Sequence, residues 1–210
     1  MILTIFSQAG GVGKSTVALN LAFTLKENDF ANVKIITNEQ AHGLDDVLPQ
    51  ENYIVLPERG AKIPPEYLRT DNNEVLIFDF AGKTDERIKQ AALVSDRVLI
   101  PTKGESANKI KQFVHTVSDI SDFTSKITIL LTAYKKVSKS NKRLFETAGD
   151  ILLKYPTFPL KSSEAYNNLW DEKRSVRSMW SDGGLNARNY AEAKDNFNEL
   201  IKHVFGGNNE

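Results

Sequence analysis

Two hydrophobic patterns alternate along this chain of 210 residues. Short apolar runs rich in β-branched and aromatic residues predict buried strands, and longer stretches with apolar residues at helical spacing predict helices. The runs that predict strands cover residues 2–6, 33–37, 53–56, 74–82, 95–102, 126–131 and 158–160. Helices are predicted over residues 14–25, 108–120 and 190–204, with a short helical turn after residue 65.

This alternation predicts an α/β fold, namely a doubly wound, mostly parallel sheet with helices on both faces. In such a sheet, ligands bind at the carboxyl ends of the strands. The length suits one well-buried domain that covers residues 1–210, and the chain shows neither an internal repeat nor a low-complexity linker.

The loop between the first strand and the first helix carries the main chemical signal. It reads Gln8-Ala9-Gly10-Gly11-Val12-Gly13-Lys14-Ser15-Thr16. Its three glycines allow backbone amides to approach phosphate oxygens, and the start of the helix adds unpaired N–H groups. The lysine supplies a charge for the β and γ phosphates, and a hydroxyl, first of all that of Ser15, is expected to ligate Mg²⁺. Because strand, glycines, lysine and hydroxyls fall in register, residues 10–16 predict a nucleotide site rather than an ordinary strand-to-helix turn.

A single acid, Asp79, stands near the end of the most apolar strand run. A carboxylate in such a run costs several kcal/mol unless a cation or hydrogen-bond donors compensate it. The expected compensating group is hydrated Mg²⁺, held together with Ser15 and reached by Asp79 through water. The alternative role, capping of the next helix, is better suited to Thr84 or Asp85.

These motifs resemble those of the ParA/MinD family of ATPases, whose deviant P-loop reads Lys-Gly-Gly-x-Gly-Lys-Ser/Thr. Residues 10–16 match that loop, and the strand with Asp79 resembles the Walker B strand of the family. Residues 95–101 and 164–166 are similar to later family segments, so the resemblance spans most of the chain. The first lysine of the family motif, which crosses a dimer interface, is replaced by Ala9, as in the carboxysome-positioning branch. Gln8 also stands where a generic P-loop has glycine.

The resemblance implies ATP and Mg²⁺ as cofactors and an ATP-sandwiched homodimer that binds non-specific DNA. It also implies slow hydrolysis stimulated by a ParB-like or cargo-adaptor protein, which positions a plasmid, a chromosome or a protein body such as the carboxysome. In the family register, Glu39 takes the place of the acid that orients the attacking water, so the resemblance makes Lys14, Glu39 and Asp79 the expected catalytic residues. A solvated loop acid is the alternative for Glu39. Two other functions stay open, a small-molecule ligase or kinase and a nucleotide sensor with little turnover.

The formal net charge is zero, so any DNA binding must come from a local basic patch. The densest basic run lies in residues 134–144 and contains no acid, and a looser basic region begins at residue 173. The candidate DNA-binding residues are Lys135, Lys136, Lys139, Lys142, Arg143, Lys173, Arg174 and Arg177. The first run has two other interpretations, a solvated helix start or a source of the charge that Ala9 lacks.

Several classes of protein are disfavoured by what the sequence lacks. Without cysteine, the chain has no disulfide, no thiolate metal site and no iron–sulfur cluster. The N-terminus runs straight into a predicted core strand instead of a signal peptide, and no apolar run is long enough to span a membrane. The apolar face of the last helix and the two tryptophans, Trp170 and Trp180, are expected to pack in the core. The expected location is therefore the cytoplasm, with no membrane partner, and the family resemblance implies that the ATP-bound form lies on the nucleoid.

Overall fold

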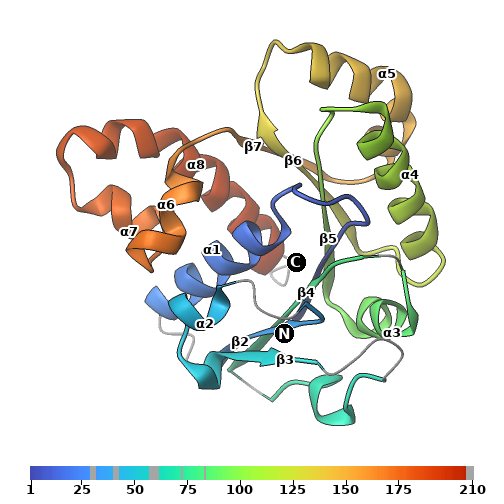
Figure 1. Cartoon of the computed structure of the whole chain (residues 1–210), viewed down its shortest axis with the longest axis horizontal. Helices are drawn as coiled ribbons and strands as arrows, with labels where there is room; N and C mark the ends of the chain where they lie inside the picture. Colours follow the sequence, from blue (N-terminus) through green and yellow to red (C-terminus); the bar gives the residue numbers. More distant parts are fainter. Residues whose placement is uncertain (29–31, 40–42, 57–61, 72, 83, 207–210) are drawn as a thin grey trace.

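One parallel sheet of seven strands organises the protein (Figure 1). The computed structural model describes residues 1–28, 32–39, 43–56, 62–71, 73–82 and 84–206. The strands are β1 (Ile2–Phe6), β2 (Asn32–Thr37), β3 (Tyr53–Val55), β4 (Glu74–Phe80), β5 (Arg97–Thr102), β6 (Ile127–Tyr134) and β7 (Thr157–Lys161). They lie side by side in the order β3-β2-β4-β1-β5-β6-β7, and neighbouring strands are parallel. The predicted doubly wound sheet is confirmed, and it is parallel throughout its described pairs.

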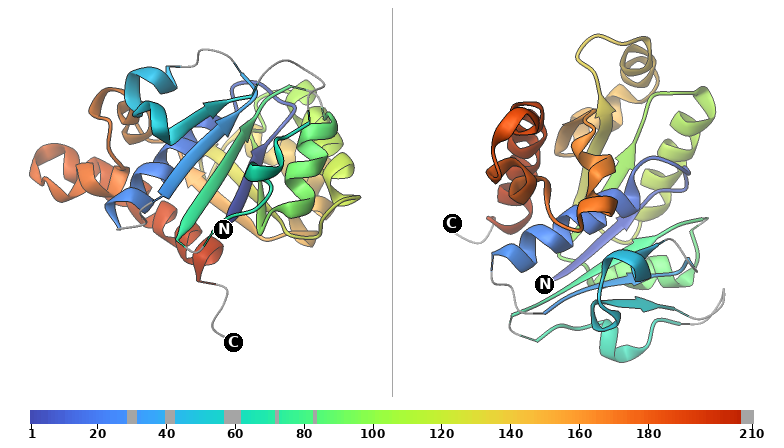
Figure 2. Two further views of the ribbon diagram at one scale, coloured as in Figure 1. Left: turned by 90° about the horizontal axis from the view of Figure 1, so that it is seen from below. Right: turned by 60° about the vertical axis from the view of Figure 1, so that its left-hand side comes forward.

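Helices cover both faces of this sheet, as Figure 2 shows. One face packs against α1 (Lys14–Glu27), α6 (Ala165–Glu172), α7 (Val176–Ser181) and α8 (Gly184–Phe205), and the other against α3 (Glu86–Val94), α4 (Ala107–Ser121) and α5 (Lys139–Lys154). The short elements are α2 (Leu44–Val47) and single 3₁₀ turns at Gln50–Asn52 and Pro65–Tyr67. Side chains alternate between the two layers: in β1, Leu3 and Ile5 join one core, and Ile2 and Phe6 join the other. This burial on both faces explains why the strands read as continuous apolar runs.

Helices α3, α5, α6 and α7 have no counterpart among the ranges predicted as helices. Strand β6 continues three residues past its predicted end to Tyr134. Its register with β7 shifts between Thr132 and Tyr134, and Ala133 between them has φ 51°. The apolar pattern stops at Leu131, whereas the ladder resumes beyond this irregularity. A bulge of this kind leaves no periodic signal, because it is defined by the pairing with another strand.

The last helix packs as expected. Its apolar side chains Tyr190, Ala193, Phe197, Leu200 and Val204 are buried against the sheet. Trp170 packs at the edge of the same core, whereas Trp180 is 38% exposed, with the Lys194 ammonium 3.7 Å from its ring centroid. Among the helices of the described residues, none is both long and apolar enough to cross a membrane.

The strand order determines where a ligand can bind. β1 lies in the middle of the sheet between β4 and β5, with β2 beyond β4 and β6 beyond β5. After β1, the chain first forms β2, β3 and β4 on one side of it and then β5, β6 and β7 on the other side. In open α/β sheets, a crevice forms where the strand order reverses in this way, outside the carboxyl ends of the strands. The loop after β1, the end of β4 with Asp79 and the turn after β5 meet at this edge.

Candidate nucleotide-binding site

The loop that follows β1 has the backbone that a phosphate-binding loop requires. Gly11 and Gly13 have φ of 65° and 89°, in the left-handed region that side chains disfavour. Helix α1 begins directly after Gly13, with neither a capping side chain nor an acid in its first turn. The capping residue Gly13 therefore supplies no side-chain acceptor for the N–H groups of this turn, which makes the helix start suited to an anion.

Lys14 is held at the centre of this loop. Its ammonium donates a hydrogen bond to the carbonyl oxygen of Ala9 at 3.3 Å, and the residue is only 8% exposed. Burial lowers the pKa of Lys14, while the negative charges of Asp79 and Glu39 act in the opposite direction. The structure thus brings together the three residues predicted to be catalytic, with both carboxylates close enough to influence the lysine.

Asp79 lies at the end of β4 between two strands, paired in register with Ile5 of β1 and Thr37 of β2, and is 5% exposed. Ser15 is half-buried in the first turn of α1. Within the described residues, no three His, Asp or Glu side chains gather into a preformed cation site. Mg²⁺ does not need such a cage, since it keeps several waters and binds through one or two carboxylates and the phosphates of the nucleotide. The donor set of Ser15 and Asp79 therefore fits hydrated Mg²⁺.

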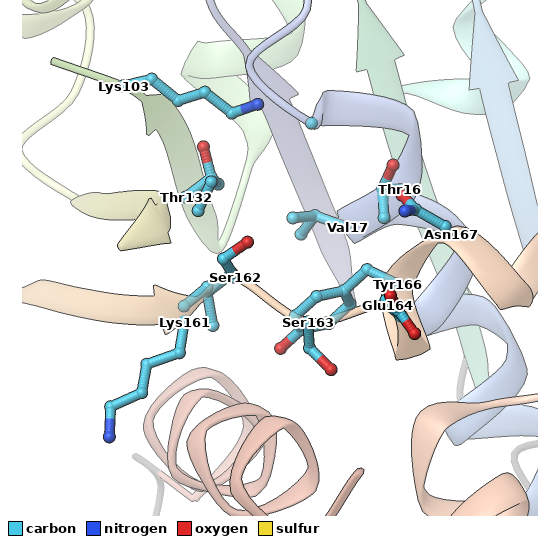
Figure 3. A pocket seen from close by; sticks show the side chains of 13 residues that line it. Thr16, Val17, Lys103, Thr132, Lys161, Ser162, Ser163, Glu164, Tyr166 and Asn167 are labelled. Carbon is cyan, nitrogen blue, oxygen red and sulfur yellow. The ribbon is translucent and has the colours of Figure 1, made fainter. Parts of the chain in front are cut away.

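A cavity of about 270 Å³ continues the site past the loop (Figure 3). Gly13, Thr16 and Val17 form one side of it, and residues 132–133 and 160–167 supply most of the rest. Lys103, at the end of β5, also lines it. The end of β6 and the segment around Tyr166 thus both border this cavity beside the phosphate loop.

Thr132 joins the loop to the ends of two strands, a role that the sequence did not reveal. Its hydroxyl lies 2.7 Å from the carbonyl oxygen of Val12 and 3.1 Å from that of Thr102. The next residue, Ala133, is the one in the left-handed conformation, and both residues line the cavity. The irregularity in β6 therefore shapes the site, as is common for backbone strain.

Asn38 ties the loop after β2 to the loop after β4. Its side-chain amide donates to the carbonyl oxygen of Ala81 at 2.9 Å, and its side-chain oxygen accepts from the Ala81 amide at 2.9 Å. Asn38 directly precedes Glu39 in the chain, and Ala81 lies two residues after Asp79. We call this pair of hydrogen bonds the clamp. Asn38 therefore positions the two segments that carry the candidate acids.

We expect Asn38→Ala to lower the free energy of unfolding by about 1–3 kcal/mol, because the amide and carbonyl groups of Ala81 both lose their partner. Urea denaturation measures this change. Asn108→Ala, at an exposed position of α4 for which no side-chain hydrogen bond is seen, is the matched control. Equal stabilities of the two variants would show that the clamp contributes nothing.

Gln8 forms a second connection at the same edge. Its side-chain amide donates to Asp119 Oδ2 at 2.8 Å and to the hydroxyl of Thr84 at 3.2 Å, and that hydroxyl donates to Asp119 Oδ2 at 2.7 Å. The residue that departs from the generic P-loop glycine thus joins the loop to α4 and to the segment after β4. The adjacent Asp85 caps α3 by accepting from Arg87 and Ile88, as expected, and leaves Asp79 for another role.

The two basic regions differ in their surroundings. Lys135, Lys136, Lys139, Lys142 and Arg143 are all exposed, around the start of α5. Two of them have partners: Lys142 pairs with Glu146, and Arg143 donates to the carbonyl oxygen of Glu105. In the second region, Arg174 pairs with Glu172 and Asp182, and Arg177 donates to Asn28 at 3.1 Å. Figure 1 shows the two regions apart, with α5 beside α4 and α7 beside α1. The candidate DNA-binding residues therefore do not form one patch within the chain.

The parallel sheet, the loop after β1 and the acid at the end of β4 define an α/β fold of the P-loop NTPase type. Comparison with solved structures narrows this class, because the whole chain has the fold of the ParA/MinD ATPases. An McdA variant from Cyanothece in complex with ATP matches at 17% identity with a TM-score of 0.64, over 100% of this chain and 97% of its own.

Two further matches have the same fold. A plasmid partition protein from Borrelia burgdorferi, bound to AMPPNP, is 21% identical with a TM-score of 0.59, over 96% of this chain and 98% of its own. MinD from Aquifex aeolicus is 13% identical with a TM-score of 0.61, over 91% of this chain and 94% of its own. No family model matches the sequence, and no curated protein matches it. At these identities the similarity establishes the fold.

Proposed function

We propose that the protein is a ParA-type ATPase that binds ATP and Mg²⁺ at residues 10–16. The observation that carries this proposal is the buried Lys14 ammonium, held in an uncapped glycine loop and flanked by the charges of Asp79 and Glu39. Such a desolvated cation and free helix amides suit a polyphosphate, whose negative charge would compensate both. Similar folds have been solved with ATP and AMPPNP bound.

Each side chain of the site has its own proposed role in the hydrolysis of ATP. Lys14 places its charge on the β and γ phosphates, and the amides of residues 10–16 bind their oxygens. Ser15 and, through water, Asp79 would hold Mg²⁺, and the ion would supply positive charge to the phosphates. Glu39 orients the attacking water, and Asn38 keeps Glu39 in place through the clamp to Ala81.

We extend the proposal to the action of the protein on DNA. An ATP-bound homodimer binds DNA without sequence preference, a partner protein stimulates slow hydrolysis, and the resulting cycle positions a cargo. The proposed DNA contacts are the exposed lysines near the start of α5 that form no ion pair within the described residues, Lys135, Lys136 and Lys139. Lys142 and Arg143 have partners, as do the arginines of the second region. The similarity to McdA and to a plasmid partition protein supports this type of function.

The test measures binding to random-sequence duplex DNA at moderate salt, without nucleotide, with ADP and with ATP–Mg²⁺. We expect binding only with ATP–Mg²⁺, and none by Lys14→Ala. The slope of the logarithm of the binding constant against the logarithm of the salt concentration reports the number of phosphate contacts. Lys136→Ala and Lys139→Ala should each reduce the magnitude of this slope by about 1, because each removes one phosphate contact. The matched control, Lys173→Ala, should leave the slope unchanged.

If DNA binding were absent in every state while ATP still bound, the positioning function would be wrong. That result would favour a small-molecule enzyme or a nucleotide sensor. A protein that binds no ATP at all would contradict the nucleotide site itself.

A further inference from the structure

Two lysines outside the loop motif lie against it from the side of β5 and α4. A Cβ atom placed on Gly11 would be 3.8 Å from the ammonium of Lys109, so this cation lies next to the backbone of the loop. Lys103, in the turn after β5, lines the cavity beside Gly13 and Thr16, and in Figure 3 its side chain points toward the loop that precedes α1. The phosphate loop is therefore bordered by two cations besides Lys14.

One carboxylate holds both of these lysines. Glu105 accepts from the Lys109 ammonium at 2.6 Å, and its other oxygen lies 3.7 Å from the Lys103 ammonium. The hydrogen bond from Lys109 is the main reason that the pKa of Glu105 is lowered. The carboxylate is 50% exposed, whereas the lysine side chains are 22% and 25% exposed. The anion is thus the outer member of the cluster and the cations are the inner ones.

The local backbone places this cluster. Ser106 caps α4 by accepting from the amide of Lys109 at 3.2 Å, which sets the start of the helix beside the loop. Arg143 of α5 donates to the carbonyl oxygen of Glu105 at 3.3 Å. The turn that carries the cluster is therefore attached at both α4 and α5.

We propose that Lys103 and Lys109 bind the phosphates of the nucleotide in cis, and that Glu105 is an internal anion which the phosphates displace. This inference rests on the proposed nucleotide site. Ala9 offers no charge and its side chain is fully buried, whereas Lys103 and Lys109 border the loop and add two positive charges to that of Lys14. An exposed lysine–carboxylate pair is weak, whereas a lysine on a polyphosphate makes a strong charge-assisted hydrogen bond. The exchange of Glu105 for the nucleotide phosphates as the partner of the two lysines therefore favours nucleotide binding.

The experiment measures the affinity for ADP and for ATP–Mg²⁺ by calorimetry. We expect Lys109→Ala to weaken both by about tenfold, because one charge-assisted contact is lost. Lys109→Arg should retain most of the affinity, since the charge is kept. Lys111→Ala, at an exposed position of the same helix, is the matched control and should bind as the wild type does. Glu105→Gln should strengthen binding, because its neutral side chain competes less for the lysines.

Equal affinities of Lys109→Ala and Lys111→Ala, with normal wild-type binding, would overturn this inference and leave the proposed function standing. Failure of the wild type to bind nucleotide would instead overturn the proposed function. A mixture of Lys14→Ala and Lys109→Ala chains tests the action in cis. We expect no recovery of affinity on mixing, and recovery would show that Lys109 acts on the partner's nucleotide.

Discussion

Lys14→Ala is expected to weaken nucleotide binding severely and leave the protein folded. The variant removes the one cation at the centre of the loop, and a lost charge-assisted contact of this kind corresponds to a loss of about a hundredfold in affinity. Calorimetry with ADP and ATP–Mg²⁺ measures the loss, with Lys111→Ala as the control. Near-normal affinity of Lys14→Ala would contradict the central role of this residue.

The fold should tolerate the change because Lys14 is costly to bury. Its pKa is lowered in the folded state, so burial of the charged ammonium disfavours folding at any pH below that lowered pKa. Without nucleotide, we expect Lys14→Ala to unfold at no lower a temperature than the wild type. As pH rises from the lowered pKa toward 10.5, the folded wild type releases its proton first and gains stability relative to the variant.

Gly104→Ala is expected to destabilise the protein by about 1–3 kcal/mol or more, through overpacking. An added Cβ would lie 2.0 Å from the carbonyl oxygen of Ser140 and 2.6 Å from its carbonyl carbon. Both atoms belong to the backbone of α5, so the start of this helix would have to move. Urea denaturation measures the effect.

The control for this variant is Gly149→Ala, within α5, because an added Cβ there meets no atom within 4 Å. We expect a gain of about 0.5–1 kcal/mol, since alanine favours helix over glycine. If both variants had the same stability, the close packing of the turn after β5 against α5 would be wrong. In Gly104→Ala we also expect weaker nucleotide binding, because Lys103 and Glu105 flank this position.

The parts of the fold that sequence reasoning found are those with a local signal. Buried strands appear as runs of apolar residues, and the loop after β1 places its glycines, Lys14 and Ser15 next to one another. Asp79 stands out because an acid is rare in such a run. Each of these patterns lies within a few residues and follows from burial or from backbone geometry.

The parts that were missed depend on contacts between distant residues. The hydroxyl of Thr132 reaches Val12 across 120 positions, and Asn38 reaches Ala81 across 43. Neither residue has neighbours that distinguish it from an ordinary polar position at a strand end. The basic residues show the same limit, since Arg174 and Lys139 look alike in the sequence, and only the folded chain gives Arg174 two acidic partners.

The segment that follows Asp79 is fastened at two points, to β2 through Asn38 and to α4 through Thr84 and Asp119. A segment anchored in this way cannot shift alone. Any displacement of Ala81 or Thr84 must either break one anchor or pull the end of β2 or α4 along with it. The two anchors therefore determine how far a change at Asp79 can spread before a hydrogen bond has to be broken.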